Sequence, residues 1–333
     1  MSAHSDRGVR GDGPLTAAGS VELAVIERSG LIESRHLGAA AVVNADGRVL
    51  RAIGDVHATI YPRSTLKPLQ SIAVLGTGAL FADDELALAT ASHCGSLAHI
   101  AVVERMLAAD GRDASALQCP AQWPLGTRER AERLASDLGP AREAMNCSGK
   151  HAGFLRASDA LGADPATYLD PEHPVQQRIR STIEEWTGDA GRRTSIDGCG
   201  APLHATSLAA LARGIARVAS GRTPDAARLM QAVAAEPWAI DGHGRANTLA
   251  IERLGVLAKI GAEGLVVIGS PSGAAVAVKV LDGSMRATTP VALALLLAEG
   301  LVDPDAVAEL LDDIAEPVLG GEEPVGALRV TLG

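Results

Sequence analysis

The chain has 333 residues, of which 47% are hydrophobic and 2% are aromatic. It carries 30 Lys and Arg against 40 Asp and Glu, a formal net charge of −10, which argues against a nucleic-acid partner because such partners favour a basic face. No segment reaches the roughly 18 uninterrupted apolar residues of a membrane span, and the start of the chain lacks the apolar region of a secretory signal. We therefore expect a cytoplasmic protein with no membrane contact, with a flexible tail over residues 1–18 and a single domain over residues 19–333.

Residue patterns predict strands near both ends of the chain and helices between them. The expected N-terminal strands are 21–28, 39–53 and 56–61, with a turn at Asn44-Ala45-Asp46-Gly47 inside the second. A helix is expected to begin near Ser64, and others over 83–91, 97–109, 128–137, 148–161, 173–186, 206–219 and 223–235. The C-terminal part predicts strands at 264–270 and 273–281, helices at 289–300 and 303–312, and a last strand at 325–331. This order predicts an α/β fold of the α+β type, in which strands from both ends form a mostly antiparallel sheet with helices packed on it.

Lysine is unusually scarce among the basic residues. The 30 basic residues include only four lysines, at positions 67, 150, 259 and 279. Coding bias alone explains the scarcity, but not which lysines remain. An amine can lose its proton when it is buried, whereas a guanidinium cannot. The remaining lysines are therefore candidates for sites that require a neutral amine.

Three short motifs suggest a serine hydrolase. Ser64 and Lys67 are three residues apart at a predicted helix start, the spacing of serine acyl enzymes in which a neutral lysine takes the serine proton. Ser92 follows a predicted helix and offers a second hydroxyl, and Lys259-Ile260-Gly261 precedes the 264–270 strand. Each motif also has a structural interpretation: Ser64 as a helix N-cap, Ser92 as a capping residue in a turn, and Lys259 as a turn lysine. Their order along the chain is more specific than any one of them.

A second group of residues has metal-ligand spacing. Cys147 and Lys150 have the spacing of a Cys-x-x-Cys zinc motif, and Cys199 follows beside Asp197 about fifty residues later. Two thiolates suit Zn²⁺, and a lysine ligand would have to be neutral. The alternative is a pair of buried thiols at a helix start. The four cysteines of the chain are expected to be thiols or ligands, not a disulfide framework.

The segment Asp241-Gly242-His243-Gly244-Arg245 is rich in glycine and polar side chains. It predicts either a loop that contacts a substrate or a simple turn.

Together these motifs resemble those of the rhizobial-type, class 3 L-asparaginases. The motifs are R-S-x-x-K-P (63–68), A-S-H (91–93), N-C-S-G-K-H (146–151), D-G-C (197–199) and K-x-G (259–261). The resemblance covers nearly the whole chain from about residue 20, and N-C-S-G-K-H is its most specific part. It implies a serine β-lactamase-like fold and a homodimer that hydrolyses L-asparagine to L-aspartate and ammonia.

The resemblance also implies roles for individual residues. Ser64 with Lys67, and Ser92 with Lys259, match two Ser–Lys tandems. We assign Ser64 as the nucleophile and Lys67 as its base, although Ser92 could exchange roles with Ser64. The implied zinc ligands are Cys147, Lys150 and Cys199, with one ion per subunit that positions the substrate. The implied substrate-binding residues are Arg63, His93, His151, Asp197, Gly244 and Arg245.

Two departures from the family pattern concern substrate affinity. Ser96 stands where the family often carries an acidic residue, and Ala246-Asn247 replace bulkier or thiol-bearing residues. Two other functions remain open at this point: a penicillin-recognising type of serine hydrolase or peptidase, and a non-enzymatic zinc-binding protein.

Overall fold

An antiparallel sheet of eight strands is the centre of the computed structural model, which describes residues 13–190 and 192–332. Seven strands follow the order β11-β12-β1-β2-β10-β9-β8, and β3 pairs with β2. The strands of this sheet are β1 (Val21–Arg28), β2 (Leu31–Val43), β3 (Val49–Ile53), β8 (Leu257–Gly261), β9 (Leu265–Gly269), β10 (Ala275–Val280), β11 (Val318–Gly320) and β12 (Glu323–Val330). The expected α/β fold with a mostly antiparallel sheet is therefore confirmed.

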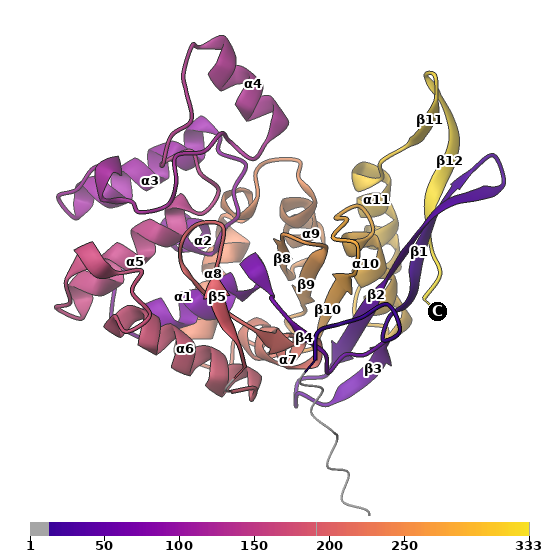
Figure 1. Cartoon of the computed structure of the whole chain (residues 1–333), viewed down its shortest axis with the longest axis horizontal. Coiled ribbons are helices and arrows are strands. Elements are labelled where there is room, and N and C mark those ends of the chain that lie inside the picture. The colour runs from indigo at the N-terminus through magenta and orange to yellow at the C-terminus, as the bar shows by residue number, and fades with distance from the viewer. Residues whose placement is uncertain (1–12, 191, 333) are drawn as a thin grey trace, which may run out of the picture.

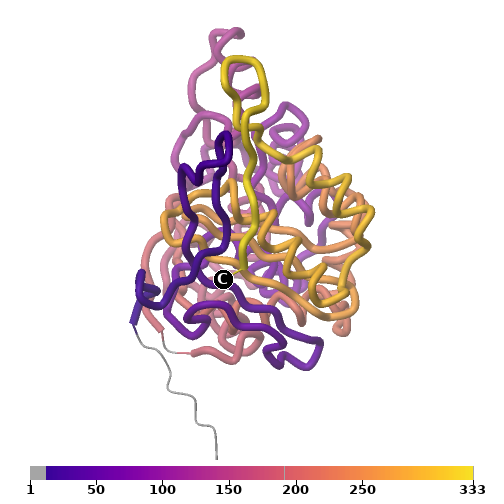
Figure 2. Tube along the Cα trace, turned by 90° about the vertical axis from the view of Figure 1, so that its right-hand side faces the viewer, coloured from indigo at the N-terminus to yellow at the C-terminus, as the bar shows by residue number. Residues whose placement is uncertain are grey.

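The two ends of the chain share this sheet. β1 pairs with β12, with Ala24 opposite Val330, and β2 pairs with β10, with Val42 opposite Val276. Figure 2 shows the N-terminal strands beside the C-terminal strand. Strands that lie far apart in sequence thus form one hydrogen-bonded surface.

Helices cover both faces of the central strands. The helices are α1 (Lys67–Leu75), α2 (Asp83–Thr90), α3 (Leu97–Ala109), α4 (Thr127–Ala135), α5 (Ser148–Ala160), α6 (Pro174–Thr187), α7 (Leu208–Ala219), α8 (Pro224–Ala235), α9 (Ala246–Leu254), α10 (Thr288–Ala298) and α11 (Pro304–Ile314). Both α7 and α10 contact β9 and β10, and Figure 1 shows α10 and α11 on one side of the sheet and the other helices mainly on the opposite side. Every residue of β9 is buried, as expected for a strand covered on both faces. No helix among the described residues is long and apolar enough to cross a membrane.

Four short 3-10 helices and two small sheets complete the described elements. The 3-10 helices are η1 (Arg63–Leu66), η2 (Ala114–Ala116), η3 (Pro165–Thr167) and η4 (Pro237–Ile240). One small sheet pairs β4 (Thr59–Ile60) with β7 (Thr206–Ser207), and the other pairs β5 (Thr194–Ile196) with β6 (Pro202–His204).

Several local expectations differ from the structure. The helix expected at Ser64 begins as η1 and becomes α-helical only at Lys67. Lys259 lies within β8 and not in a turn before a strand, while α9 and the β5–β6 hairpin were not expected. Of the tail expected over residues 1–18, residues 1–12 lie outside the described part, whereas Pro14 forms a β-bridge with Thr59.

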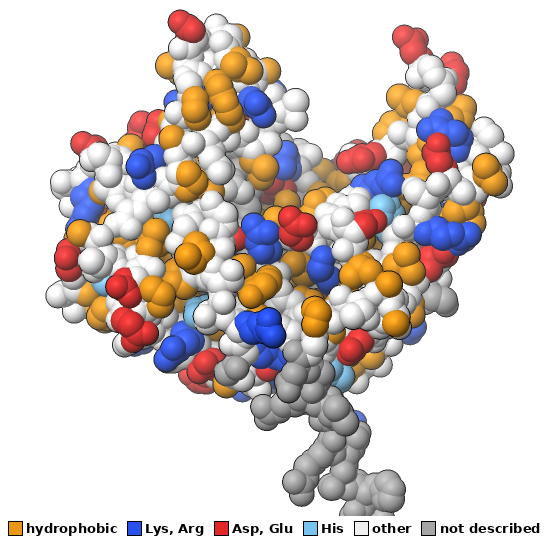
Figure 3. All heavy atoms as spheres, viewed as in Figure 1, with side chains coloured by type: hydrophobic (Ala, Val, Ile, Leu, Met, Phe, Trp, Pro, Cys, Tyr) orange, Lys and Arg blue, Asp and Glu red, His pale blue; other side chains and the backbone are white. Residues whose placement is uncertain are grey.

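Two segments project from the same side of the molecule. Helix α4 has no buried residue, and the β11–β12 hairpin extends beyond the rest of the sheet (Figure 1). The space-filling view shows the surface hollowed between the two projections (Figure 3).

Candidate active site

The turn that carries Ser64 begins at a residue with an unusual backbone. Arg63 has a φ of +52°, a left-handed conformation that costs energy for a residue with a Cβ and is concentrated at functional sites. Ser64 follows it in η1, where side chains three residues apart eclipse one another, so Ser64 and Lys67 project from the same side of the turn. Ser64 is partly exposed, and its hydroxyl makes no hydrogen bond to another described residue. It is therefore free to meet a ligand.

Two lysines meet at the second serine. The Nζ atom of Lys67 lies 3.1 Å from Ser92 Oγ, and the Nζ atom of Lys259 lies 2.8 Å from the same oxygen. Lys67 also donates a hydrogen bond to the Ala91 carbonyl, and Lys259 donates to the Ile260 carbonyl at 2.8 Å. Both lysines are almost completely buried, at 1% and 0% exposure. The structure thus places three of the four expected catalytic residues in one continuous hydrogen-bonded chain.

Burial sets the protonation state at one end of this chain. Burial, followed by the nearby charge of Lys67, lowers the pKa of Lys259 well below its ordinary value. Both effects disfavour a charged ammonium. This direction favours a neutral amine at Lys259, the kind of group that the scarcity of lysine suggested.

Backbone pairing holds the glycine-rich segment beside Ser92. The amide of Ser92 donates to the Ile240 carbonyl at 3.1 Å, and the amide of Cys94 donates to the Asp241 carbonyl at 2.8 Å. The buried Asp241 carboxylate then accepts a hydrogen bond from Arg245 Nε at 2.7 Å. Gly244 occupies the turn just before Arg245 with a φ of +72°. The segment expected as a substrate loop thus lies next to the serine, with its guanidinium held in place by Asp241.

His93 presents a buried nitrogen with no partner. Ser148 Oγ donates to the Glu143 carbonyl at 2.9 Å, so it must accept the proton of His93 Nε2, which lies 2.9 Å away. This assignment leaves the lone pair on His93 Nδ1, and no described residue pairs with that atom. Burial, with the neighbouring His99, Lys67 and Lys259, lowers the pKa of His93 well below its ordinary value. His93 is therefore a neutral hydrogen-bond acceptor next to Ser92.

His151 is held by a residue that the sequence did not indicate. Its Nδ1 atom lies 2.7 Å from the hydroxyl of Tyr168, while its Nε2 atom is buried without a partner among the described residues. Burial, followed by the charge of Lys150, lowers the pKa of His151 to about 3. Tyr168 is one of only two tyrosines in the chain, but no local motif surrounds it, so the sequence gave no basis for assigning it a role.

The three expected metal ligands lie together. Lys150 Nζ lies 3.1 Å from Cys199 Sγ, and the thiol of Cys147 is close enough to Cys199 to influence its pKa. The interaction with the Cys147 side chain is the main cause that lowers the pKa of Cys199, with Lys150 adding to it, while burial opposes the shift. For Lys150, burial alone would lower the pKa, but the charges of Cys199, Cys147 and Asp197 raise it.

This group of donors fits a zinc ion in its chemistry. Two sulfur atoms and one nitrogen are typical zinc donors, and all three side chains are buried. The described residues contain no group of three or more His, Cys, Asp and Glu side chains that could hold a metal. A metal at this position would therefore depend on the Lys150 amine in addition to the two thiolates.

Asp197 connects this group to the Ser64 turn. One carboxylate oxygen accepts a hydrogen bond from Arg63 Nε at 2.7 Å, and the other lies 3.8 Å from Cys199 Sγ. Arg63 also lines a cavity of about 500 Å³ that reaches the β5–β6 hairpin. Arg63 is thus anchored by Asp197 while part of its guanidinium faces open space.

The remaining lysine lies apart from the site. Lys279 is half-buried on β10 and donates hydrogen bonds to the Glu263 and Val280 carbonyls. Burial lowers its pKa from the ordinary value. It lines the same cavity as Arg63, but within the described part of the chain it donates no hydrogen bond to Ser64 or Ser92.

Comparison with solved structures finds neighbours of low sequence identity. Mglu in its glutamate form matches with a TM-score of 0.47 and 16% identity, over 79% of this chain and 61% of the other. A β-lactamase from Mycobacterium bovis matches with a TM-score of 0.42 and 14% identity, over 79% and 95% of the two chains. A β-lactamase described as putative, from Bacteroides dorei, gives 0.44 and 16% identity over 83% and 93%. The chain thus spans about three fifths of the length of Mglu, and no curated protein matches it significantly.

A serine contacted by two buried lysines on a mixed α/β fold is typical of the serine hydrolases that use lysine as a base. The family model for L-asparaginase II matches residues 24–330 of the chain. The chain belongs to the L-asparaginase II family. This match confirms the resemblance to asparaginases that the motifs indicated.

Proposed function

We propose that the protein hydrolyses the side-chain amide of L-asparagine to L-aspartate and ammonia through a serine acyl-enzyme. Family membership supports the reaction class. The observation that carries the proposal is the hydrogen-bonded chain Lys67–Ser92–Lys259, which ends in an amine whose pKa is lowered by burial. A buried neutral amine has few structural uses, but it can accept the proton that a serine loses when it attacks an amide.

We assign the nucleophile to Ser64 and the proton relay to Ser92. Ser92 is 4% exposed and already contacts both lysine amines, so its oxygen is well placed to pass a proton between them. Ser64 has a free, partly exposed hydroxyl one turn before Lys67. These differences favour Ser64 as the nucleophile, as assigned from the sequence, over the alternative in which Ser92 is the nucleophile.

The reaction then follows in two halves. Ser64 Oγ attacks the side-chain amide carbon of asparagine, its proton passes to Lys67, and a proton of Lys67 passes through Ser92 to Lys259. The relay returns this proton to the amide nitrogen, the C–N bond breaks, and ammonia leaves a β-aspartyl ester on Ser64. A water molecule gives a proton to the same relay and attacks the ester carbon, which releases aspartate and restores the Ser64 hydroxyl.

The substrate is a small zwitterion, and the site offers groups for both of its charges. Arg63 and Arg245 supply guanidinium groups that suit its α-carboxylate. Asp197 supplies a carboxylate, and His93 Nδ1 a neutral acceptor, for its α-ammonium. We also propose that the backbone turn at Gly244 and the unpartnered Nε2 of His151 line the site, since both lie on elements adjacent to these groups.

We further propose that Cys147, Lys150 and Cys199 bind one Zn²⁺ per subunit. When bound, the ion would add a fixed positive charge next to Asp197, which supports a role in positioning the substrate. Without the ion, the charges of Lys150 and Cys199 balance each other. A homodimer and a cytoplasmic location stay predictions.

The proposal can be tested by measuring ammonia release by the purified protein from L-asparagine and from L-glutamine. Ring opening of a chromogenic β-lactam, which releases no ammonia, should be followed separately by absorbance, with zinc content measured on the same sample. We expect ammonia from L-asparagine. Hydrolysis of the β-lactam alone would favour a penicillin-recognising hydrolase, and bound zinc without any turnover would favour a zinc-binding protein; either result would contradict the proposal.

A further inference from the structure

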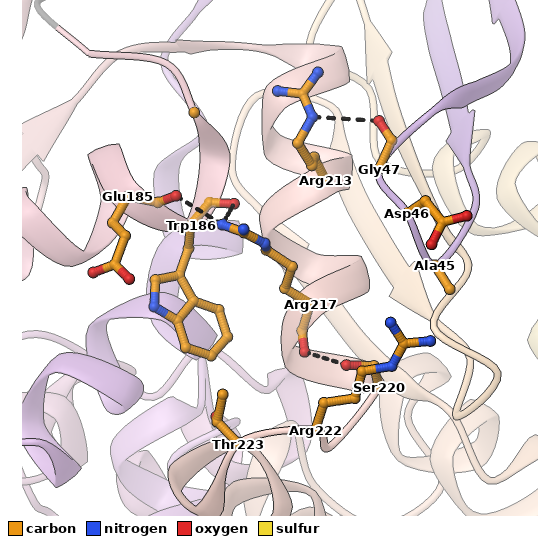
Figure 4. Close-up of a pocket in the computed structure, with 11 residues that line it drawn as sticks. Ala45, Asp46, Gly47, Glu185, Trp186, Arg213, Arg217, Ser220, Arg222 and Thr223 are labelled. Carbon is orange, nitrogen blue, oxygen red and sulfur yellow. Dashed lines mark hydrogen bonds between the residues drawn. The ribbon is translucent and has the colours of Figure 1, made fainter.

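A second cavity lies away from the serine and lysine residues, at the ends of α6 and α7. It has a volume of about 540 Å³, which is within the range of small-molecule sites. The turn between β2 and β3 forms one wall, and the end of α6, α7 and the connection from α7 to α8 form the others (Figure 4). None of the residues proposed for catalysis or zinc binding lines it.

Three arginines surround this cavity without a carboxylate partner. Arg213 and Arg217 lie one turn apart on α7, and Arg222 follows in the connection to α8. No described carboxylate lies within 4.0 Å of any of the three, although 14 other arginines form ion pairs within the described part of the chain. The cavity therefore concentrates unpaired positive charge on a chain whose net charge is −10.

Two of these guanidinium groups are held in place by neutral acceptors. Arg213 Nη1 donates to the Thr187 carbonyl at 2.6 Å, and Arg217 Nη1 donates to the Glu185 carbonyl at 2.7 Å (Figure 4 shows the Arg217 bonds). These bonds cap the end of α6, but each uses only one of the terminal nitrogens. Arg222 makes no hydrogen bond to any described residue. Donors thus remain available around the cavity, and two of the three guanidinium groups are already oriented.

The other walls add an aromatic surface and a helix start. Trp186 lines the cavity from the last turn of α6, and its indole nitrogen makes no hydrogen bond to a described residue. Thr223 is the N-cap of α8, where its hydroxyl accepts the Ala226 amide. The positive end of that helix dipole adds to the arginine charges, and two carboxylates, Asp46 and Glu185, also line the cavity against three guanidinium groups.

We propose that this cavity binds an organic anion, with a phosphate or carboxylate group on the arginines and a planar ring against Trp186. Guanidinium groups bind such oxyanions through paired hydrogen bonds, and an indole face favours a flat ring. A nucleoside monophosphate combines both features at a size that the cavity admits. This site is separate from the proposed hydrolysis of asparagine, and its occupancy can be measured without turnover.

Titration of the full chain with adenosine monophosphate, inorganic phosphate, L-aspartate and adenosine tests the proposal by calorimetry. We expect saturable binding of the monophosphate in the micromolar to low-millimolar range, and weaker binding of inorganic phosphate and of adenosine. L-Aspartate is also the proposed product of the serine site, so tighter binding of L-aspartate than of the monophosphate would identify a carboxylate as the anion only if Arg222→Ala weakens it. No saturable binding of any of the four up to about 10 mM would overturn the proposal.

Substitutions of the cavity arginines test whether the monophosphate binds in this cavity. Arg222→Ala removes a side chain that bonds to no described residue, so the fold should be unaffected, and we expect the monophosphate to bind about tenfold more weakly. Arg217→Ala should have a similar effect, with folding checked by circular dichroism because it also removes a cap of α6. Arg128→Ala, on the exposed helix α4, serves as the control and should bind normally. Equal binding by Arg222→Ala and the unaltered chain would place the ligand elsewhere and contradict the assignment.

Discussion

Individual lysines carry the chemistry proposed for this protein. Lys67, Lys150 and Lys259 are buried and lie at the proposed catalytic and metal sites, while Lys279 is half-buried elsewhere. Burying an amine is costly unless it is paired or loses its proton. Lys150 is paired with Cys199, whereas Lys259 loses its proton preferentially. The two lysines thus show the two ways in which a buried amine can be accommodated.

The lowered pKa of Lys259 predicts a pH profile. A proposed base must be unprotonated, so kcat/KM should rise with pH through the pKa of Lys259 and level off below the ordinary lysine value of about 10.4. Lys259→Met should lower kcat/KM by about 10²–10⁴-fold and abolish this rise. The measurement is ammonia release against pH for both forms. If kcat/KM of Lys259→Met still rose with pH in the same range, the titrating group would be a residue other than Lys259.

Lys67 offers a test of proton transfer as distinct from charge. Lys67→Arg keeps a positive charge, but a guanidinium does not give up its proton in proteins. We expect this variant to lose nearly all turnover while its circular dichroism stays unchanged. Steady-state ammonia release measures the effect, with Lys279→Arg as a matched control that should keep its activity. Retained activity in Lys67→Arg would reject Lys67 as the base.

At the scale of elements, close helix packing places the N-terminal end of α5. A Cβ atom added at Gly149 would lie 2.5 Å from the Leu88 carbonyl oxygen of α2, closer than non-bonded atoms allow. Glycine at this position therefore lets α5 approach α2, and it immediately precedes Lys150. The same contact explains why a helix-breaking residue occurs in the first turn of α5.

Gly149→Ala should consequently destabilise the protein. The clash with α2 should lower the free energy of unfolding by about 1–3 kcal/mol, which exceeds the roughly 1 kcal/mol gained from better helix propensity. Gly153→Ala, one turn further along, is the control, since its Cβ would meet side chains and no backbone atom, with Ala89 at 3.2 Å and Phe81 at 4.0 Å. Urea denaturation measures the free energy of unfolding of both variants and of the unaltered protein. Equal stability of the two variants would show that α5 can shift without cost.

The turn between β5 and β6 carries the proposed link from the metal site to the substrate. It contains Asp197 and Cys199, which connect Arg63 with Lys150. If zinc only positions the substrate, its removal by a chelator should raise KM for asparagine more than it lowers kcat. Kinetics before and after chelation, followed by zinc addition, measure the effect. A loss of kcat at unchanged KM, restored by zinc, would instead indicate a direct role in the chemistry.

For the whole molecule, the sequence predicted the architecture better than the connections within the site. The hairpin turn at Asn44–Gly47 and most helices were predicted, because local residue patterns encode them. Helix α9 was missed because it starts directly after a glycine-rich segment. Strand β8, which carries Lys259, was not predicted, because a charged residue interrupts its short apolar pattern.

The arrangement of the candidate site depends on contacts that no local pattern contains. The motifs identified Ser92 and the segment that begins at Asp241 separately. Their meeting depends on two backbone hydrogen bonds, from Ser92 to Ile240 and from Cys94 to Asp241. Lys259 reaches Ser92 only because β8 takes its place at one edge of the sheet. Such long-range pairings are set by the whole fold and could not be predicted from one sequence.

The most direct test of the account is to trap the covalent intermediate. The purified chain is mixed with L-asparagine, quenched with acid within milliseconds, digested and analysed by mass spectrometry. The account predicts that the peptide containing Ser64 gains the mass of one aspartyl group, and that Ser64→Ala prevents this gain while Ser92→Ala slows it. An aspartyl group on the Ser92 peptide, or turnover that persists in Ser64→Ala, would contradict it.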